Sequence, residues 1–156
     1  MVARVNDAVV LQPGAGRPID LGPFAMTVKA SGETTGGLFS LLEADEPPHF
    51  GPPLHVHHDA AEAFYVLAGE YVIFLEDREV TCPAGSFVFI PAGMRHGFRV
   101  GSVPSRKLNF YFPAAMVGYF NDLSAAIARG DAEDALSAIA TRHAMEIVGP
   151  VPESYV

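Results

Sequence analysis

The 156-residue sequence predicts an all-β fold with a short pair of α-helices near its C-terminus. In about the first 112 residues, turn-forming residues separate apolar runs that are too short for amphipathic helices. The 15 glycines and 13 prolines exceed the roughly 12% of residues that these two types usually contribute. The glycines have no triplet period, which excludes collagen. A chain of this length can bury its own core, so we expect one domain spanning residues 1–156.

The expected strands are rich in Val, Ile, Phe and Tyr and are bounded by Gly, Pro or acidic turns. Most aromatic side chains on the middle strands are expected in the core, namely Tyr65, Tyr71, Phe74, Phe87 and Phe89. The expected strands span residues 8–11, 24–30, 38–42, 62–68, 71–75, 79–82, 86–90, 95–100 and 106–112.

A helical period replaces the strand pattern after residue 113. Met116, Phe120, Leu123 and Ile127 recur at spacings of four, three and four, which places them on one face of a helix. Gly130 follows at the position of a helix C-cap. Asp131 is then placed to N-cap a second helix, and the tail from residue 149 is expected to be extended.

The charge balance excludes several classes of partner. Ten Lys and Arg against 18 Asp and Glu give a net charge of −8, and no basic cluster is present for nucleic acid or an anionic membrane. No uncharged apolar run approaches the roughly 18–20 residues of a membrane span. The first residues lack the basic-then-apolar order of a signal peptide. A lone cysteine, Cys82, cannot form an internal disulfide, and we expect a cytoplasmic location.

Two histidines and a glutamate form the first chemically distinctive pattern. His55 and His57 are separated by one residue, so on a strand both imidazoles point to the same face. The turn Asp59–Ala61 is expected to return the chain as a neighbouring strand, which brings Glu62 beside the pair. A carboxylate among the apolar residues that follow is costly unless it is paired or binds a metal.

A fourth candidate ligand lies further along the chain. His96 follows Pro91 and Gly93, a Pro-x-Gly turn that can set the pose of the next strand. The first segment contains His55-x-His57, then four residues, Glu62, six residues and Gly69. The second contains Gly85, then five residues, Pro91-x-Gly93, two residues and His96. This pattern resembles the two-part signature of the cupin superfamily.

The resemblance covers residues 52–98 and departs from the signature at its edges. His49 stands where the first part usually opens with glycine, and Val100 stands where asparagine often closes the second part. The resemblance implies a jelly-roll barrel over about residues 24–113 with a helical extension over about 114–148. The residues around His55 and His57, and the trailing helices, are most similar to quercetinase-like cupins, relatives of flavonol 2,4-dioxygenases.

The resemblance implies one divalent transition metal held by His55, His57, Glu62 and His96, with Glu62 also acting as a catalytic base. Fe, Mn or Ni suits such a ligand set, and Zn is open by ligand count. A cavity beside the metal would take the substrate. Strand alternation points to four lining residues, which are Phe64, Val66, Phe98 and Tyr111.

Three functions follow as hypotheses. The first is a dioxygenase that uses O₂ on an enolic or phenolic small molecule. The second is an isomerase, cyclase or lyase in which the ion is a Lewis acid. The third is a noncatalytic module that binds a small molecule. The resemblance and the exposed edges of a β-sheet also predict a homodimer.

Overall fold

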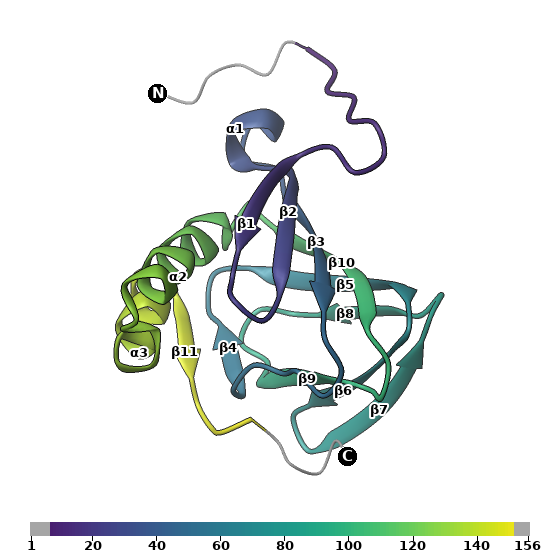
Figure 1. Ribbon diagram of the computed structural model, residues 1–156, viewed down its shortest axis with the longest axis vertical. Coiled ribbons are helices and arrows are strands. Elements are labelled where there is room, and N and C mark those ends of the chain that lie inside the picture. The colour runs from purple at the N-terminus through teal and green to yellow at the C-terminus, as the bar shows by residue number, and fades with distance from the viewer. Residues whose placement is uncertain (1–6, 152–156) are drawn as a thin grey trace.

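Two antiparallel sheets face each other in a computed structural model that describes residues 7–151 (Figure 1). The six-stranded sheet has the order β1 (Arg17–Asp20), β2 (Ala25–Ala30), β3 (Ser40–Glu46), β10 (Ser105–Phe112), β5 (Ala61–Ala68) and β8 (Phe87–Ile90). The five-stranded sheet has the order β11 (Met145–Ile147), β4 (His55–His57), β9 (His96–Val100), β6 (Glu70–Leu75) and β7 (Arg78–Pro83). The prediction of an all-β jelly-roll with short C-terminal helices is confirmed.

The ends of the strand pattern differ from prediction. Residues 8–11 are exposed and form no strand. The structure adds β1, the four-residue helix α1 (Gly32–Thr35) and β11, none of which the sequence pattern predicted. Each of these elements is at most four residues long, so none carries a full period of apolar residues. β11 matters for function because it pairs with β4, from His55 to His57.

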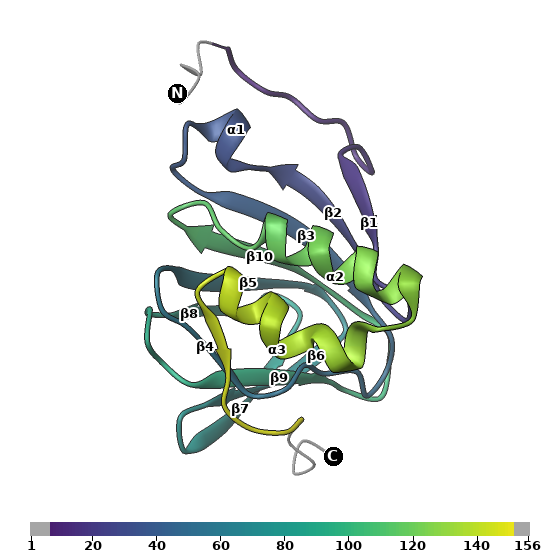
Figure 2. The same cartoon turned by 90° about the vertical axis from the view of Figure 1, so that its left-hand side faces the viewer.

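Helices α2 (Val117–Arg129) and α3 (Ala132–Arg142) lie against one side of the two sheets, as Figures 1 and 2 show. Their buried residues pack in one cluster with residues of β1, β2 and β3, among them Ile19 and Leu42. Gly130 ends α2 with φ 78°, as the C-cap prediction requires. Asp131 is the N-cap residue of α3, as predicted, but its carboxylate contacts Arg129 Nε at 3.3 Å and makes no side-chain capping bond.

A second apolar cluster fills the space between the sheets. It includes Phe64, Val66, Tyr71, Ile73 and Phe98, all buried. The prediction that most middle-strand aromatics are core residues is wrong for three side chains, which point outwards by strand alternation and remain 42–64% exposed: Tyr65, Phe87 and Phe89. The two phenylalanines lie on β8, whose outer edge has no neighbouring strand among residues 7–151. None of the helices in that range has the length and apolar character of a membrane span.

Two glycines of the sequence pattern have a conformational reason. Gly69 has φ 76°, and a Cβ there would overlap the side chain of Ser105. Gly93 has φ 87° in the turn before β9. Its N–H donates to the carbonyl oxygen of His57 at 2.9 Å, so this turn is attached directly to β4. The turn thereby joins the two segments that carry the histidine pattern.

Candidate metal centre

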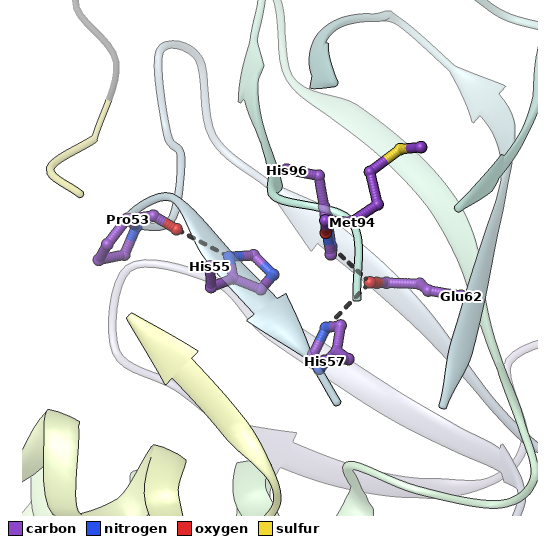
Figure 3. A network of polar contacts seen from close by, with 6 residues as sticks. All are labelled: Pro53, His55, His57, Glu62, Met94 and His96. Carbon is purple, nitrogen blue, oxygen red and sulfur yellow. Dashed lines mark hydrogen bonds and ion pairs between the residues drawn. The ribbon is translucent and has the colours of Figure 1, made fainter. Parts of the chain in front are cut away.

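Four buried side chains converge between the sheets: His55, His57, Glu62 and His96 (Figure 3). Each is at most 7% exposed, and one ligand atom from each lies within 4.8 Å of the others. The structure therefore brings together all four residues that the spacing singled out. Among residues 7–151, they form a group of three imidazoles and one carboxylate that could hold a metal ion.

The strand register explains how these side chains meet. His55 and His57 alternate with Val56 on β4 and share its inner face. His55 lies directly opposite His96 of the adjacent strand β9. The turn at Asp59–Ala61 was expected to return the chain as a strand next to β4, and this prediction is wrong for Glu62. The chain crosses there from the five-stranded sheet to β5 of the six-stranded sheet, so Glu62 reaches the histidines from the opposite layer.

Backbone carbonyls orient two of the imidazoles. His55 Nδ1 lies 2.7 Å from the carbonyl oxygen of Pro53, and His96 Nδ1 lies 2.9 Å from that of Met94 (Figure 3). A carbonyl oxygen only accepts hydrogen bonds, so each Nδ1 carries the proton. In the neutral ring the lone pair is then on Nε2, the atom available to a metal. Hydrogen bonds of this kind fix the tautomer of metal-binding histidines.

The carboxylate of Glu62 contacts both His57 and His96. Its Oε2 lies 2.9 Å from His96 Nε2 and 3.0 Å from His57 Nε2. Only the His96 contact has the alignment of a hydrogen bond, and His57 Nε2 is a buried nitrogen with no hydrogen-bond partner among the described residues. A buried nitrogen in that position is costly unless a ligand satisfies it. The residues present therefore fit a divalent cation.

The pKa shifts in this group favour the protonation states that bind a cation. Burial lowers the pKa of His55, the nearby His96 and His57 act in the same direction, and together they bring it from 6.5 to about 3. Burial opposes ionisation of Glu62, but His57 and His96 overcome it and hold the pKa of this carboxyl well below its usual value. Burial likewise opposes the charge on His96, yet its bond to Glu62 leaves its pKa raised. Neutral His55 and ionised Glu62 are the forms that bind metals.

A cavity of about 270 Å³ adjoins this group. His55 and Glu62 are among its lining residues, together with apolar side chains of the sheets and of α2 and α3. Of the four residues that alternation assigned to a substrate pocket, Phe98 and Tyr111 line this cavity. Phe64 and Val66 pack instead in the apolar cluster between the sheets.

A second group of buried polar residues lines the same cavity, and sequence reasoning missed most of it. Lys107 Nζ lies 2.9 Å from Glu46 Oε1, and the Tyr71 hydroxyl donates to the same oxygen at 2.8 Å. Lys107 and Asn109 share the inward parity of Tyr111 on β10, so strand alternation was a usable signal for them. Glu46 lies on β3 and had no comparable signal.

The remaining histidines lie elsewhere. His49 is exposed and does not line the cavity. His58 is exposed and contacts Glu146 at 3.0 Å. His143 follows α3 and contacts the Asp122 carboxylate at 2.7 Å, which links the two helices.

The sequence and the fold are similar to those of known cupins. Residues 42–108 match the family model described as "Cupin domain". Over 101 residues, 65% of this chain, the sequence is 32% identical to "Quercetin 2,3-dioxygenase" of Bacillus subtilis, of which it spans 30%. An RmlC-like cupin from Shewanella frigidimarina superposes with a TM-score of 0.61 at 14% identity, covering 71% of this chain and 96% of that one.

Another structure shares the fold over more of the chain. Streptomyces PAC13 (Y89F) with uridine superposes with a TM-score of 0.56 at 14% identity, covering 85% of this chain and 83% of that one. At these identities the likeness shows the fold alone. With the family match over residues 42–108 and the buried group of three histidines and one glutamate, the chain resembles small quercetinase-like cupins.

Proposed function

We propose that the protein is a metal-dependent dioxygenase acting on an enolic or phenolic small molecule. The observation that carries this proposal is that the His55, His57, Glu62 and His96 group adjoins a largely apolar cavity, which His55 and Glu62 line. The similarity to a quercetin dioxygenase supports the class of reaction, although this chain spans only 30% of that protein. The four side chains would hold one divalent ion.

A bound redox-active ion such as Fe, Mn or Ni would supply Lewis acidity and electron transfer at this position. The chain itself contributes the proton acceptor. Glu62 is ionised at neutral pH because His57 and His96 keep its pKa low, and its Oε2 can accept the proton of a substrate hydroxyl. Transfer of that proton to Glu62 leaves the substrate as an enolate or phenolate, the electron-rich form that reacts with O₂.

The cavity positions the substrate and limits the access of water. Phe98 and Met116 are among the apolar residues that line it. An apolar wall strengthens the interaction between the charged end of the substrate and the metal centre, because water is excluded there. The volume of about 270 Å³ is just below the usual lower bound of roughly 300 Å³ for ligand pockets, which favours a small substrate.

Tyr111 favours a second candidate, an isomerase, cyclase or lyase that uses no O₂. It lies directly opposite Glu62 in the register of β10 and β5, and it lines the cavity. Burial and Glu62 raise the pKa of its hydroxyl well above the usual value, so Tyr111 stays protonated. A carboxylate beside a protonated phenol can move a proton between two carbons or oxygens of one substrate.

Oxygen consumption separates these functions. Protein loaded in turn with Fe(II), Mn(II), Ni(II) and Zn(II) would be mixed with quercetin or an enediol in an oxygen electrode, with matched samples under nitrogen. The dioxygenase requires oxygen uptake that matches substrate loss. No uptake with any flavonol or enediol contradicts it. Turnover under nitrogen favours the second candidate, and binding without product favours a noncatalytic module.

The expected homodimer and cytoplasmic location stay predictions. Phe87 and Phe89 on the edge strand β8 are 64% and 55% exposed, which supports association through this side of the six-stranded sheet. Light scattering of the purified protein and of a Phe87→Ser variant measures the mass directly. A monomeric mass for the unmodified protein contradicts the dimer.

A further inference from the structure

Three polar side chains stand on the inner face of β10 in a row that starts at the metal centre. Tyr111 is in register with Glu62, Asn109 follows two residues away, and Lys107 two residues further. All three are buried and line the cavity. At the rise of an extended strand, Asn109 stands about 7 Å and Lys107 about 13 Å from the Tyr111 position.

Asn109 has a polar atom that the fold does not satisfy. The residue is 3% exposed, and its Oδ1 has no hydrogen-bond partner within the described part of the chain. The reason is visible in the register, because its direct neighbours across β3 and β5 are Leu42 and Phe64. Neither can donate a hydrogen bond. A buried amide between two apolar neighbours, lining a cavity, requires a partner from within that cavity.

The Lys107 end of the row is held rigidly and is electrically balanced. Its Nζ lies 2.9 Å from Glu46 Oε1 and stands over the rings of Phe98, Phe64 and Tyr71, 4.2–5.2 Å from their centroids. The charges of Lys107 and Glu46 cancel, so this end does not demand a charged ligand. It presents a carboxylate that accepts hydrogen bonds, and Asn109 Oδ1 adds another acceptor to the lining of the same cavity.

We propose that Asn109, Glu46 and Lys107 form a second polar subsite that selects substrates with a hydroxyl group remote from the oxygen held at the metal centre. The substrate class is an uncharged, hydroxylated molecule of about two linked ring systems. One oxygen reaches Glu62, and a hydroxyl about 7–13 Å away donates to Asn109 Oδ1, while Glu46 and Lys107 line the subsite as a balanced pair of charges. This inference deepens the proposed function and rests on the substrate being held at that centre.

A matched pair of ligands tests the subsite without turnover. The protein is loaded with Zn(II), which has no redox chemistry, and titrated under nitrogen with 3-hydroxyflavone and with 3,4′-dihydroxyflavone. Both carry the enolic oxygen, and only the second carries the remote hydroxyl. We expect the second to bind at least about tenfold more tightly, the usual effect of a hydrogen bond made in a buried site.

Two variants assign that preference to the subsite. Asn109→Leu has a similar volume and no amide, so the preference should fall below about twofold. Leu123→Met changes an apolar residue of the same cavity and should alter both affinities by the same factor. Asn109→Leu removes a buried polar group that has no partner. The melting temperature of the variant should therefore equal or exceed that of the parent protein. A purely structural role for Asn109 predicts the opposite.

Each result decides the inference. Equal affinity of the parent protein for the two flavones, no binding of either one, or a preference retained by Asn109→Leu contradicts it. The test also stands apart from the oxygen measurement. A preference that depends on Asn109 in a protein that consumes no O₂ supports the subsite and contradicts the dioxygenase.

Discussion

His96 Nε2 and Glu62 Oε2 lie 2.9 Å apart although their strands belong to opposite sheets. This contact joins the two layers at their centre, where a metal ion would add a stronger connection. His55 and His57 approach the same point from β4, which is only three residues long and is paired on one side with β11. The site is therefore made by packing the two sheets together, and its chemistry depends on that packing.

Replacing Glu62 by Gln should separate metal binding from proton transfer. The amide keeps the shape of the side chain and one oxygen, but it is no longer a base. We expect kcat for a turned-over flavonol or enediol to fall about 100- to 10,000-fold, while the protein retains metal. Steady-state kinetics with metal analysis of the same sample measures both. A metal-replete Glu62→Gln variant with undiminished kcat contradicts the role of Glu62 as the base.

The stability of the metal-free protein should depend on pH through His55. Its pKa of about 3 in the folded state lies below its ordinary 6.5, so the unfolded chain binds more protons between these values. Stability is full at neutral pH and falls as the pH drops below about 6.5, by at most about 1.4 kcal/mol per pH unit. Glu62 acts in the same direction at lower pH, because its pKa is also lowered.

His96 acts in the opposite sense, because its raised pKa gives stability that is lost as the pH rises. A variant therefore isolates the His55 contribution. Urea unfolding of chelator-treated protein gives the free energy of unfolding at each pH. Between about pH 5 and about pH 6.5, this free energy should change less steeply with pH for His55→Asn than for the parent protein. Equal slopes would mean that His55 is not held neutral by burial.

The buried ion pair predicts a large loss of stability when one partner is removed. Lys107→Met leaves the Glu46 carboxylate buried without its cation, at a cost of about 3–5 kcal/mol. Combining it with Glu46→Gln should recover most of that loss. Arg106 is a matched control, since it is next on the same strand and pairs with Glu43 at 3.4 Å with a half-exposed side chain. Arg106→Met should cost less than about 1 kcal/mol.

Denaturant unfolding of the four proteins measures these differences. A loss for Lys107→Met no larger than that for Arg106→Met would show that the pair is not sealed from water. A double variant as unstable as the single one would show that the loss comes from packing of the lysine stem and not from the isolated carboxylate.

Gly69 offers a test of the turn that the sequence pattern requires. Gly69→Ala places a Cβ against Ser105 at φ 76°, whereas Gly85→Ala has a similar φ of 93° with no atom within 4 Å of its Cβ. Both variants bear the strain of positive φ, about 1–2 kcal/mol. We expect Gly69→Ala to lose about 1–3 kcal/mol more than Gly85→Ala by urea unfolding. Equal losses would mean that Ser105 moves aside at no cost.

The sequence predicted which four residues form the ligand group, but it did not predict which sheet each one comes from. Spacing on a strand places His55 and His57 on one face, and this follows from local geometry. That Glu62 arrives from the other sheet depends on how the layers pack, which local periodicity does not contain. Alternation along β10 places Asn109 on one face with Tyr111, and Lys107 shares that parity, but parity alone does not say that the face points inward. Their contacts are with residues of other strands, above all Glu46 on β3. Alternation along β10 does not predict those contacts.

The content of bound metal tests the central claim most directly. Elemental analysis of the purified protein should find about one equivalent of a divalent transition metal per chain, and His55→Ala and His96→Ala should lose most of it. His58→Ala, which changes an exposed histidine next to His57, should keep the metal. Undiminished metal in the His55→Ala and His96→Ala variants would contradict the assignment of this site.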